Sequence, residues 1–400
     1  MIIVTIYIVT NSSAISSTKP VNDEQDFLQI SSIKQQNIAI DNFNLPIYWN
    51  WRDMNGTDWT TPAKNQGRCS SCIIFGIVGA LESIIKIREG CADFNPDLSE
   101  QYVMSCIFMK NLFSVTPFYE RINGTVFESS FPYNARFLIP CSHKSSNWKK
   151  YFVPSSSFYI ISGVTREFIK NKLIEHGPVV IPIYAPGWSR FSNGLIGIWG
   201  RIHRNSDDYC SLKVPKFPFR YSNHWIIIVG WKDDPFIENG GYWICKNCWG
   251  SNWGYNGFFN LEYGSLNSDS GYIGWIDYTP EDFNWPPIGS PRLNGPIYME
   301  ANVEYEFNFS SVDPEGDPVY YKFYWDDGSQ SDWLGPFESG GIVTIKHIWN
   351  RSGSYNVKVI AKNENGSESD QMPNNKFKMK NSPASHILPQ FSLFKLFLNL

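Results

Sequence analysis

The chain has little charge of either sign. Charged residues make up 18% of its 400 residues, and 34 basic residues nearly balance 38 acidic ones, leaving a net charge of −4. Because there is no basic excess to attract phosphate groups, we expect no nucleic acid partner. Aromatic residues reach 16%. This composition argues against disorder and favours two or three packed, β-rich domains.

Long apolar runs are scarce as well. The apolar stretches at the two ends, residues 1–10 and 387–400, are too short for a membrane-spanning helix, which needs about 20 residues. We interpret residues 1–17 as a signal peptide, with a short buried strand as the alternative. Residues 18–44 are expected to be a short pro-segment or linker. Residues 381–400 form an apolar tail, for which an interfacial anchor, a docking segment and an added edge element stay open.

Cys72 opens an apolar segment that runs to residue 88. Its apolar positions recur at intervals of three and four, which predicts a buried amphipathic helix with Cys72 at its N-terminus. The unpaired N–H groups and the dipole at a helix N-terminus favour a thiolate, the nucleophilic form of cysteine. A single cysteine at a helix start is more often a core residue, so a catalytic role requires a base and an oxyanion donor elsewhere.

Residues of the required types follow in order. His224 stands at the head of a β-branched strand, and Asn247 ends a second apolar strand shortly before Trp249. Gln66 precedes Cys72 by six residues. Taken singly, these are a strand-end histidine, a turn asparagine, a core tryptophan and a surface glutamine. The spacings between Cys72, His224 and Asn247 are 224 − 72 = 152 and 247 − 224 = 23 residues.

In order and spacing, these segments resemble the papain-like cysteine peptidases over about residues 45–278. The resemblance implies an α+β, two-lobe fold, with a helical lobe, a β-rich lobe and the active site in the cleft between them. It also implies a disulfide between Cys106 and Cys141, and neither a metal nor a cofactor. Flanking segments that agree with the family are Leu45-Pro46, Trp51-Arg52, residues 61–67, residues 98–101, residues 175–178 and residues 253–257.

The resemblance assigns a role to each site residue. Cys72 is the nucleophile, His224 the general base and acid, and Asn247 the residue that orients the histidine. The Gln66 side chain and the Cys72 backbone N–H are the oxyanion donors. Trp249 supports the site by covering the histidine–asparagine contact from water.

Three positions depart from the family pattern. Ile73 stands where an aromatic residue usually follows the nucleophile, and Ser70 where the family usually has glycine. The Gly-Cys-x-Gly-Gly segment after Cys106 is missing, and residues 107–116 replace it. Its glycines let the backbone approach substrate, so specificity does not carry over from the family. The missing segment also held the usual disulfide partner of Cys69.

Eight cysteines fit an oxidising compartment. With Cys72 reserved as nucleophile, seven remain, so at least one more stays unpaired or pairs with another chain. The partners of five cysteines stay open: Cys69, Cys91, Cys210, Cys245 and Cys248.

Downstream of the Cys72 helix, a helix is expected at about 99–106 and another at 166–176, where Gly177 and Pro178 follow as stop signals. Short strands are expected in the β-rich half at residues 179–184, 225–231, 242–246 and 257–262.

Residues 280–295 are rich in proline and predict a linker after a peptidase domain at 45–279. Alternating β segments then predict an all-β sandwich at 296–380, which resembles a PKD-type, immunoglobulin-like domain. The aspartates at 313–317 and 326–327 suit turns, and calcium binding is the less favoured alternative. The expected strands are residues 305–309, 319–325, 343–349 and 355–361.

We therefore expect an exported, secreted or cell-surface cysteine endopeptidase that cleaves proteins or peptides through a thioester. Its PKD-like domain is expected to act as a spacer or to contact a cell surface or polysaccharide. The alternative is a catalytically weak or idle papain-fold protein used for adhesion or binding. Six Asn-x-Ser/Thr sequons fit export, at Asn11, Asn55, Asn123, Asn308, Asn350 and Asn365.

Overall fold

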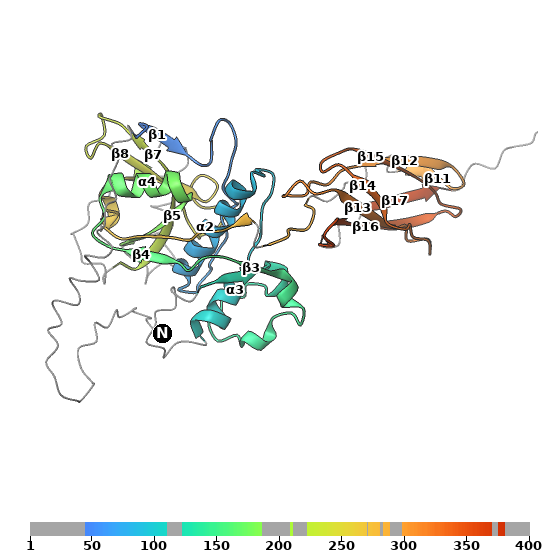
Figure 1. Cartoon of the computed structure of the whole chain (residues 1–400), viewed down its shortest axis with the longest axis horizontal. Helices are drawn as coiled ribbons and strands as arrows, with labels where there is room; N and C mark the ends of the chain where they lie inside the picture. Colours follow the sequence, from blue (N-terminus) through green and yellow to red (C-terminus); the bar gives the residue numbers. More distant parts are fainter. Residues whose placement is uncertain are drawn as a thin grey trace, which may run out of the picture. The chain divides into compact units, whose positions relative to one another are not determined.

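The structure is a computed structural model (Figure 1). It describes residues 45–109, 122–185, 209–210, 222–269, 271–280, 283–288, 298–369 and 375–380. The expected signal peptide, pro-segment and C-terminal tail lie outside the described residues. The chain divides into two units between Asp282 and Phe283.

The first unit is built on a sheet of eight strands among the described residues, in the order β4-β10-β5-β7-β8-β9-β6, with β1 paired to β7. Most neighbours are antiparallel, and β6 and β9 are parallel. The strands are β1 (Tyr48–Asn50), β4 (Tyr159–Ile161), β5 (Val179–Ile183), β6 (Tyr209–Cys210), β7 (His224–Asp233), β8 (Gly241–Lys246), β9 (Phe258–Glu262) and β10 (Ile273–Trp275).

Helices cover both faces of the central strands β5 and β7. Side chains alternate between the faces of a strand. Val179 and Ile226 join Leu173 of α4 (Arg166–His176) in one core cluster. Val180 and Ile227 face α2 (Cys72–Glu89) instead. Because both faces are covered, these strands read as unbroken apolar runs rather than as alternating ones.

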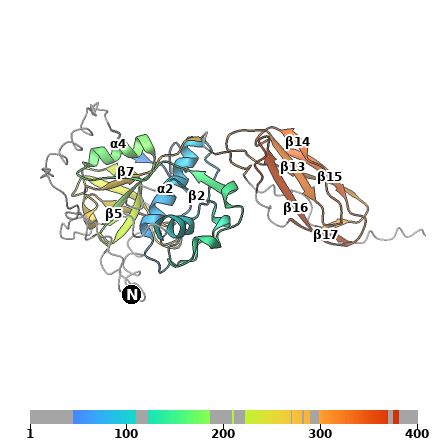
Figure 2. The ribbon, with the colours of Figure 1, turned by 60° about the horizontal axis from the view of Figure 1, so that its bottom comes forward.

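Helix α2 lies between the sheet and a second group of elements, as Figures 1 and 2 both show. All of its residues from 72 to 86 are buried, which explains why a helix in this position is apolar around most of its circumference. The second group contains α3 (Glu100–Tyr102), a π-helical turn (Val103–Phe108), the β2–β3 ribbon (Gly124–Val126 and Phe152–Pro154) and three 3₁₀ turns (Glu128–Ser130, Cys141–His143 and Trp148–Tyr151). A further 3₁₀ turn, Ser265–Asn267, follows β9.

The helix expected at residues 99–106 takes a different form. Only Glu100–Tyr102 is α-helical, and the chain continues as a π-helical turn in which the N–H of Met109 bonds to the carbonyl of Met104. Ser99 caps the start, since its Oγ accepts from the N–H of Tyr102 at 3.0 Å. Over so short a segment, an apolar spacing of three to four residues does not distinguish the two kinds of turn.

The second unit is an antiparallel-rich β-sandwich. A five-stranded sheet in the order β11-β17-β16-β13-β14 faces the β12–β15 ribbon. Phe309 of the ribbon packs against Tyr321 and Phe323 of the sheet, with ring centroids 4.7 and 5.0 Å apart. The strands are β11 (Tyr298–Glu300), β12 (Glu304–Phe309), β13 (Val319–Tyr324), β14 (Leu334–Phe337), β15 (Val343–Ile348), β16 (Gly353–Asn363) and β17 (Asn375–Lys380).

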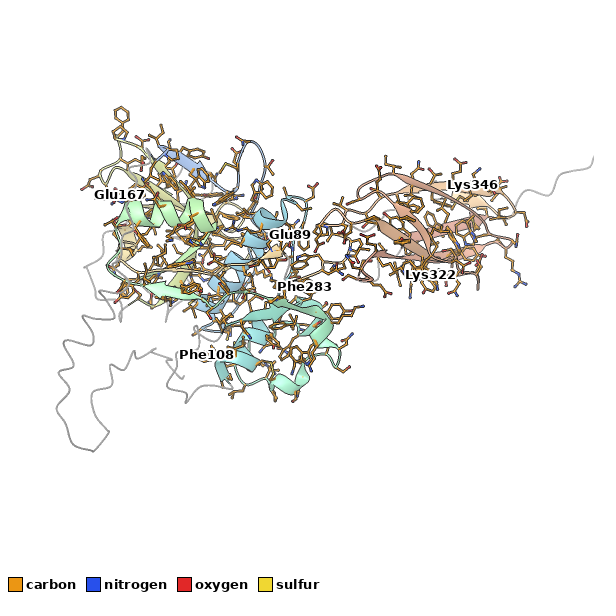
Figure 3. All side chains as sticks on the ribbon, in the orientation of Figure 1. Glu89, Phe108, Glu167, Phe283, Lys322 and Lys346 are labelled. Carbon is orange, nitrogen blue, oxygen red and sulfur yellow. A yellow bond between two sulfur atoms is a disulfide. The ribbon has the colours of Figure 1, made fainter. Side chains whose placement is uncertain are left out.

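Polar side chains cover the outside of this sandwich. Lys346 on β15 points outward (Figure 3) and pairs across the ribbon with Glu304 and Glu306 at 3.5 and 2.9 Å. Inward residues alternate with these along each strand, as the period of two predicts. The α+β fold followed by an all-β sandwich therefore agrees with the expectation from sequence.

The aspartates for which calcium was considered act as acceptors within the protein. Asp313 Oδ1 accepts from the N–H of Asp317, and Asp327 Oδ1 accepts from the N–H of Ser329. Asp326 Oδ2 accepts from the N–H of Asn356. The first two contacts are the turn chemistry expected of aspartate, and the third ties the turn to β16.

Residues 283–288, inside the expected linker, pack on the second unit. Trp285 is 1% exposed. The backbone N–H of Trp285 donates to Glu315 Oε1 at 2.7 Å, and its backbone carbonyl accepts from Asn363 Nδ2 at 2.9 Å. Among the described residues, no helix combines the length and the apolar composition needed to cross a membrane.

Candidate active site

Glycines set the position of the Cys72 helix. A Cβ at Gly76 would come within 2.8 Å of Val180 Cγ1, and one at Gly79 within 2.9 Å of Ile227 Cδ1. Real side chains do not approach so closely, so α2 lies against β5 and β7 at a distance that only glycine permits. The first residue of α2, Cys72, is thereby held near the start of β7.

The Cys72 thiol is enclosed. Cys72 is 7% exposed, and burial raises the pKa of its thiol to about 11. A hydrogen bond from the backbone of Trp225, the residue after His224, opposes that rise. The helix start was expected to favour a thiolate, but burial outweighs it because desolvation penalises the charged form. The resting thiol is therefore neutral at neutral pH.

His224 is completely buried, and its ring is oriented by Asn247. His224 Nε2 lies 2.9 Å from Asn247 Oδ1. The N–H of Cys248 donates to the same Oδ1 at 2.8 Å. An oxygen that accepts from the ring requires the proton on Nε2, so Nδ1 carries the basic lone pair. Burial lowers the pKa of His224 to about 4, and the Asn247 contact opposes that shift.

The register of the sheet explains the place of Trp249. Ile227 of β7 pairs with Lys246 of β8 in an antiparallel ladder. Continuing that ladder by three residues puts Trp249 opposite His224. The two rings stack with centroids 4.9 Å apart and planes 27° apart. Trp249 therefore covers the imidazole, and the reduced local dielectric strengthens the contact with Asn247.

Gln66 is completely buried, and both ends of its amide are engaged. Its Nε2 donates to the carbonyl of Cys69, and its Oε1 accepts from the Cys248 thiol at 2.7 Å. An amide nitrogen carries two hydrogens. One is used within the loop, and the second is the hydrogen that the expected oxyanion role of Gln66 requires.

A short backbone ladder ties the Gln66 loop to the segment after Asn247. The N–H of Gln66 donates to the carbonyl of Cys248, and the N–H of Gly250 donates to the carbonyl of Lys64, at 2.9 and 3.0 Å. Asn65 and Trp249 form the bridge between these bonds. The oxyanion candidate and the histidine-orienting residue are thus held in one register.

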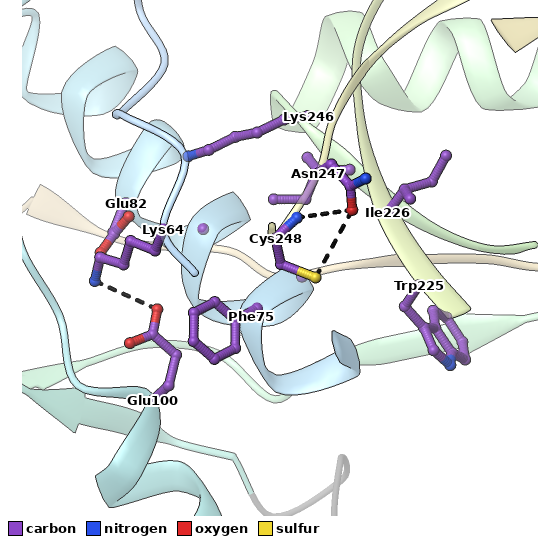
Figure 4. A pocket seen from close by; sticks show the side chains of 12 residues that line it. Lys64, Phe75, Glu82, Glu100, Trp225, Ile226, Lys246, Asn247 and Cys248 are labelled. Carbon is purple, nitrogen blue, oxygen red and sulfur yellow. Dashed lines mark hydrogen bonds and ion pairs between the residues drawn. The ribbon is translucent and has the colours of Figure 1, made fainter. Parts of the chain in front are cut away.

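A network of buried charges supports this ladder. Lys64 Nζ pairs with Glu82 at 2.6 Å and with Glu100 at 3.3 Å. Thr61 Oγ1 donates to Glu82 and accepts from Lys246 Nζ, at 2.8 and 2.7 Å. Figure 4 shows Lys64, Glu82, Glu100 and Lys246 around a small cavity of about 10 Å³, close to the space that one water molecule occupies.

Protonation in this network is shifted by burial. Burial raises the pKa of Glu100 to about 8, while Lys64 opposes the shift and Glu82 adds to it. Burial lowers the pKa of Lys246 to about 8. Burial alone would lower the pKa of Lys64, but the negative charges of Glu82, Glu100 and Asp97 outweigh burial and raise this pKa. The network therefore holds a cationic Lys64 beside Glu100, whose carboxyl group burial pushes toward its neutral form.

The disulfide implied by the family resemblance is present. Cys106 and Cys141 are bonded, with Cα atoms 4.9 Å apart. Cys69, Cys72 and Cys248 are reduced and buried. Residues 107–116, which replace the missing glycine-rich segment, lie partly outside the described residues, and so does the Cys210 side chain.

Sequence inspection missed two residues of this site. Cys248 contacts Gln66, and its position beside Asn247 was the available signal. Tyr133 donates to the Gln66 carbonyl at 2.9 Å and shares a hydrogen bond with Ser71 at 2.8 Å. It lies 67 residues from Gln66 along the chain, and no local pattern indicated it.

Comparisons with known proteins agree with this architecture. Residues 45–271 match the papain family cysteine protease, and residues 292–375 match the PKD domain. The chain is 28% identical over 240 residues to the probable cysteine protease RD19B of Arabidopsis thaliana, covering 54% of this chain and 58% of that protein. It is 28% identical over 237 residues to human cathepsin O, covering 57% and 64%. The chain thus spans about three fifths of the length of these relatives.

Solved structures include digestive procathepsin L 3 of Tenebrio molitor, with 22% identity, a TM-score of 0.43 and coverage of 59% of this chain and 71% of that chain. The PKD domain of an M14-like peptidase from a Thermoplasmatales archaeon has 33% identity, a TM-score of 0.23 and coverage of 24% and 98%. The family match takes in 227 of 400 residues (271 − 45 + 1). The chain belongs to the papain family of cysteine proteases, and a PKD domain follows its protease domain.

Proposed function

We propose that the protein is an exported cysteine endopeptidase that hydrolyses peptide bonds of proteins or peptides through a thioester intermediate. The main observation behind the proposal is that the Cys72 thiol lies at the start of strand β7. The backbone of Trp225 hydrogen-bonds the thiol, and the neighbouring His224 has its ring fixed by Asn247. A nucleophile, a base and an orienting residue are the parts that thiol-based acyl transfer requires.

The reaction begins from two neutral groups. As the Cys72 sulfur attacks the substrate carbonyl, His224 Nδ1 takes the thiol proton. Separately, each charge is disfavoured by burial, with the pKa of Cys72 raised to about 11 and that of His224 lowered to about 4. Forming thiolate and imidazolium side by side offsets part of both penalties, because opposite charges attract strongly at low dielectric.

The tetrahedral intermediate carries its charge on the former carbonyl oxygen. The second hydrogen on Gln66 Nε2 and the backbone N–H of Cys72 donate to this oxygen. When the intermediate collapses, His224 gives its proton to the departing amine and the thioester remains. A water molecule then attacks the thioester with His224 as base. A carboxylate product leaves, and the Cys72 thiol is restored.

Export is supported by the sequons. The asparagines of all five sequons within the described residues are exposed on the surface, where a glycan can be attached. The disulfide between Cys106 and Cys141 fits the same oxidising compartment. The five exposed sequon asparagines are Asn55, Asn123, Asn308, Asn350 and Asn365.

The competing function is that of an idle papain-fold protein used for adhesion or binding. The enclosure of the site favours it, since Cys72 is 7% exposed and His224 is fully buried. The idle protein requires no reactive thiol, whereas the peptidase requires one that an active-site reagent can reach.

The test is labelling of the reduced, full chain with a peptidyl epoxide probe, together with hydrolysis of denatured casein. A peptidase gives labelling and hydrolysis that both disappear in Cys72→Ala, while Cys91→Ala, which removes a half-buried thiol just beyond the C-terminal end of α2, retains them. Folded protein that takes up no probe at Cys72 would refute the peptidase and leave the binding function.

A further inference from the structure

Cys69 is a second thiol on the turn that carries the nucleophile. Cys69 and Cys72 are separated by two serines, and Cys72 is the first residue of α2. Both cysteines are reduced and buried, at 5% and 7% exposure. Cysteines separated by two residues at a helix N-terminus are a spacing suited to reversible disulfide chemistry.

The backbone of Cys69 is held in place while its side chain has no covalent partner. Its N–H donates to the carbonyl of Gln66 at 3.3 Å, and its own carbonyl accepts from the Gln66 side chain. The thiol rests against Met104 Sδ at 3.8 Å, a weak contact. The thiol also hydrogen-bonds the side chains of Ser71 and Tyr133. Turning the Cys69 side chain toward Cys72 exchanges these side-chain contacts for a covalent bond, and it leaves the backbone contacts of the loop intact.

The two thiols are within electrostatic reach of each other, since a charge on Cys69 would raise the pKa of Cys72. Cys248 is also close to Cys72 by this measure. Its thiol, however, is already committed to Gln66 Oε1 at 2.7 Å, and it lies on a different segment. Of the two neighbours, Cys69 is the one whose sulfur can turn without releasing the Gln66 side chain.

We propose that Cys69 and Cys72 form a redox-active dithiol, which a low-molecular-weight disulfide oxidises to an intramolecular disulfide. The Cys72 thiolate attacks one sulfur of the small disulfide, releasing one small thiol and leaving a mixed disulfide on Cys72. The Cys69 thiolate then attacks the Cys72 sulfur and releases the second small thiol. In total, two protein thiols lose two hydrogens, and one small disulfide is reduced to two small thiols.

The same reaction withdraws the nucleophile. While the disulfide stands, Cys72 cannot attack a peptide bond, and a small thiol reverses the block by the same exchange. Dithiol chemistry does not depend on the proposed peptidase activity. It is therefore tested by a mass measurement that needs no substrate.

The sequence offers a convenient readout, because trypsin cleaves after Arg68 and after Lys86. The resulting peptide, residues 69–86, contains Cys69 and Cys72 and no other cysteine. The reduced full chain is incubated with oxidised glutathione, alkylated with iodoacetamide and digested. We expect this peptide to be lighter by two hydrogens and to carry no alkyl group, and prior dithiothreitol treatment to return both alkyl groups.

Matched variants identify the resolving thiol. In Cys69→Ser, the reaction should stop at the mixed disulfide, so Cys72 retains one glutathione moiety. In Cys248→Ala, the 69–86 disulfide should still form. The proposal is overturned if wild-type Cys72 keeps glutathione, if the peptide becomes linked to one containing Cys248, or if both cysteines are alkylated after oxidation.

Discussion

Replacing Gln66 by alanine separates the oxyanion contribution from the reactivity of the thiol. In the structure, the side chain orders the loop through Cys69 and Cys248. In the proposed mechanism, it also offers one amide hydrogen to the oxyanion. Losing one such donor raises the barrier by about 2.7–4 kcal/mol, which is about 10²- to 10³-fold in kcat. Leaving the buried partners unpaired costs a further 1–3 kcal/mol or so in stability.

The assay compares two reactions of the same cysteine. Peptide hydrolysis, measured as kcat and KM on a fluorogenic peptide that wild type cleaves, passes through an oxyanion. Alkylation of Cys72 by iodoacetamide does not. We expect Gln66→Ala to lose kcat by about 10²- to 10³-fold, with little change in KM or in the alkylation rate.

Cys248→Ala is the matched control. It removes the same thiol contact at Gln66 Oε1 but keeps both amide hydrogens, so its kcat should fall far less than that of Gln66→Ala. If a folded Gln66→Ala protein kept wild-type kcat, or if its alkylation rate fell in parallel with kcat, the assignment of Gln66 as oxyanion donor would be wrong.

Three further perturbations test the packing, the disulfide and the burial of the histidine. Gly76→Ala should lower the free energy of unfolding by about 1–3 kcal/mol, because the added Cβ meets Val180 Cγ1 at 2.8 Å. In urea titrations, adding Val180→Ala should recover part of that loss, and no recovery would contradict the close contact between α2 and β5. Removing the disulfide with Cys106→Ala and Cys141→Ala should lower the free energy of unfolding by about 2–4 kcal/mol, because the unfolded chain gains loop entropy. The midpoint of the urea transition should fall below that of wild type, and an unchanged midpoint would count against a stabilising disulfide. The pKa of His224 is lowered from 6.5 to about 4, so the unfolded state binds the His224 proton more tightly than the folded state. The free energy of unfolding should therefore rise by about 3 kcal/mol between pH 4 and 6.5. Subtracting the pH curve of His224→Gln from that of wild type isolates this rise, and a difference that does not change with pH would rule it out.

The sequence was sufficient where local chemistry decides structure. Helix α4 begins after Thr165, whose Oγ1 accepts from Phe168 N–H at 3.2 Å, and it ends before Gly177. These are the start and stop signals that short-range rules describe. The order of Cys72, His224 and Asn247 along the chain was likewise sufficient to indicate the family, since each lies at the edge of a recognisable segment.

The sequence was insufficient where distant residues decide the environment. A helix start alone favours a Cys72 thiolate, but the enclosure that raises the Cys72 pKa comes from strands more than a hundred residues away. The contact of Tyr133 with Gln66 has the same origin. The pairing of Lys246 with Thr61 spans 185 residues. A pattern search along the chain cannot find such partners before the fold brings them together.

The packing of residues 283–288 on the second unit bears on how that unit can be produced by itself. An expression boundary placed just after the proline-rich stretch would exclude residues 283–288. Such a cut would remove Trp285, a fully enclosed side chain whose loss from a core typically costs about 3–5 kcal/mol. It would also strip partners from Glu315 and Asn363. A fragment of the PKD unit that is meant to fold should therefore begin before Phe283.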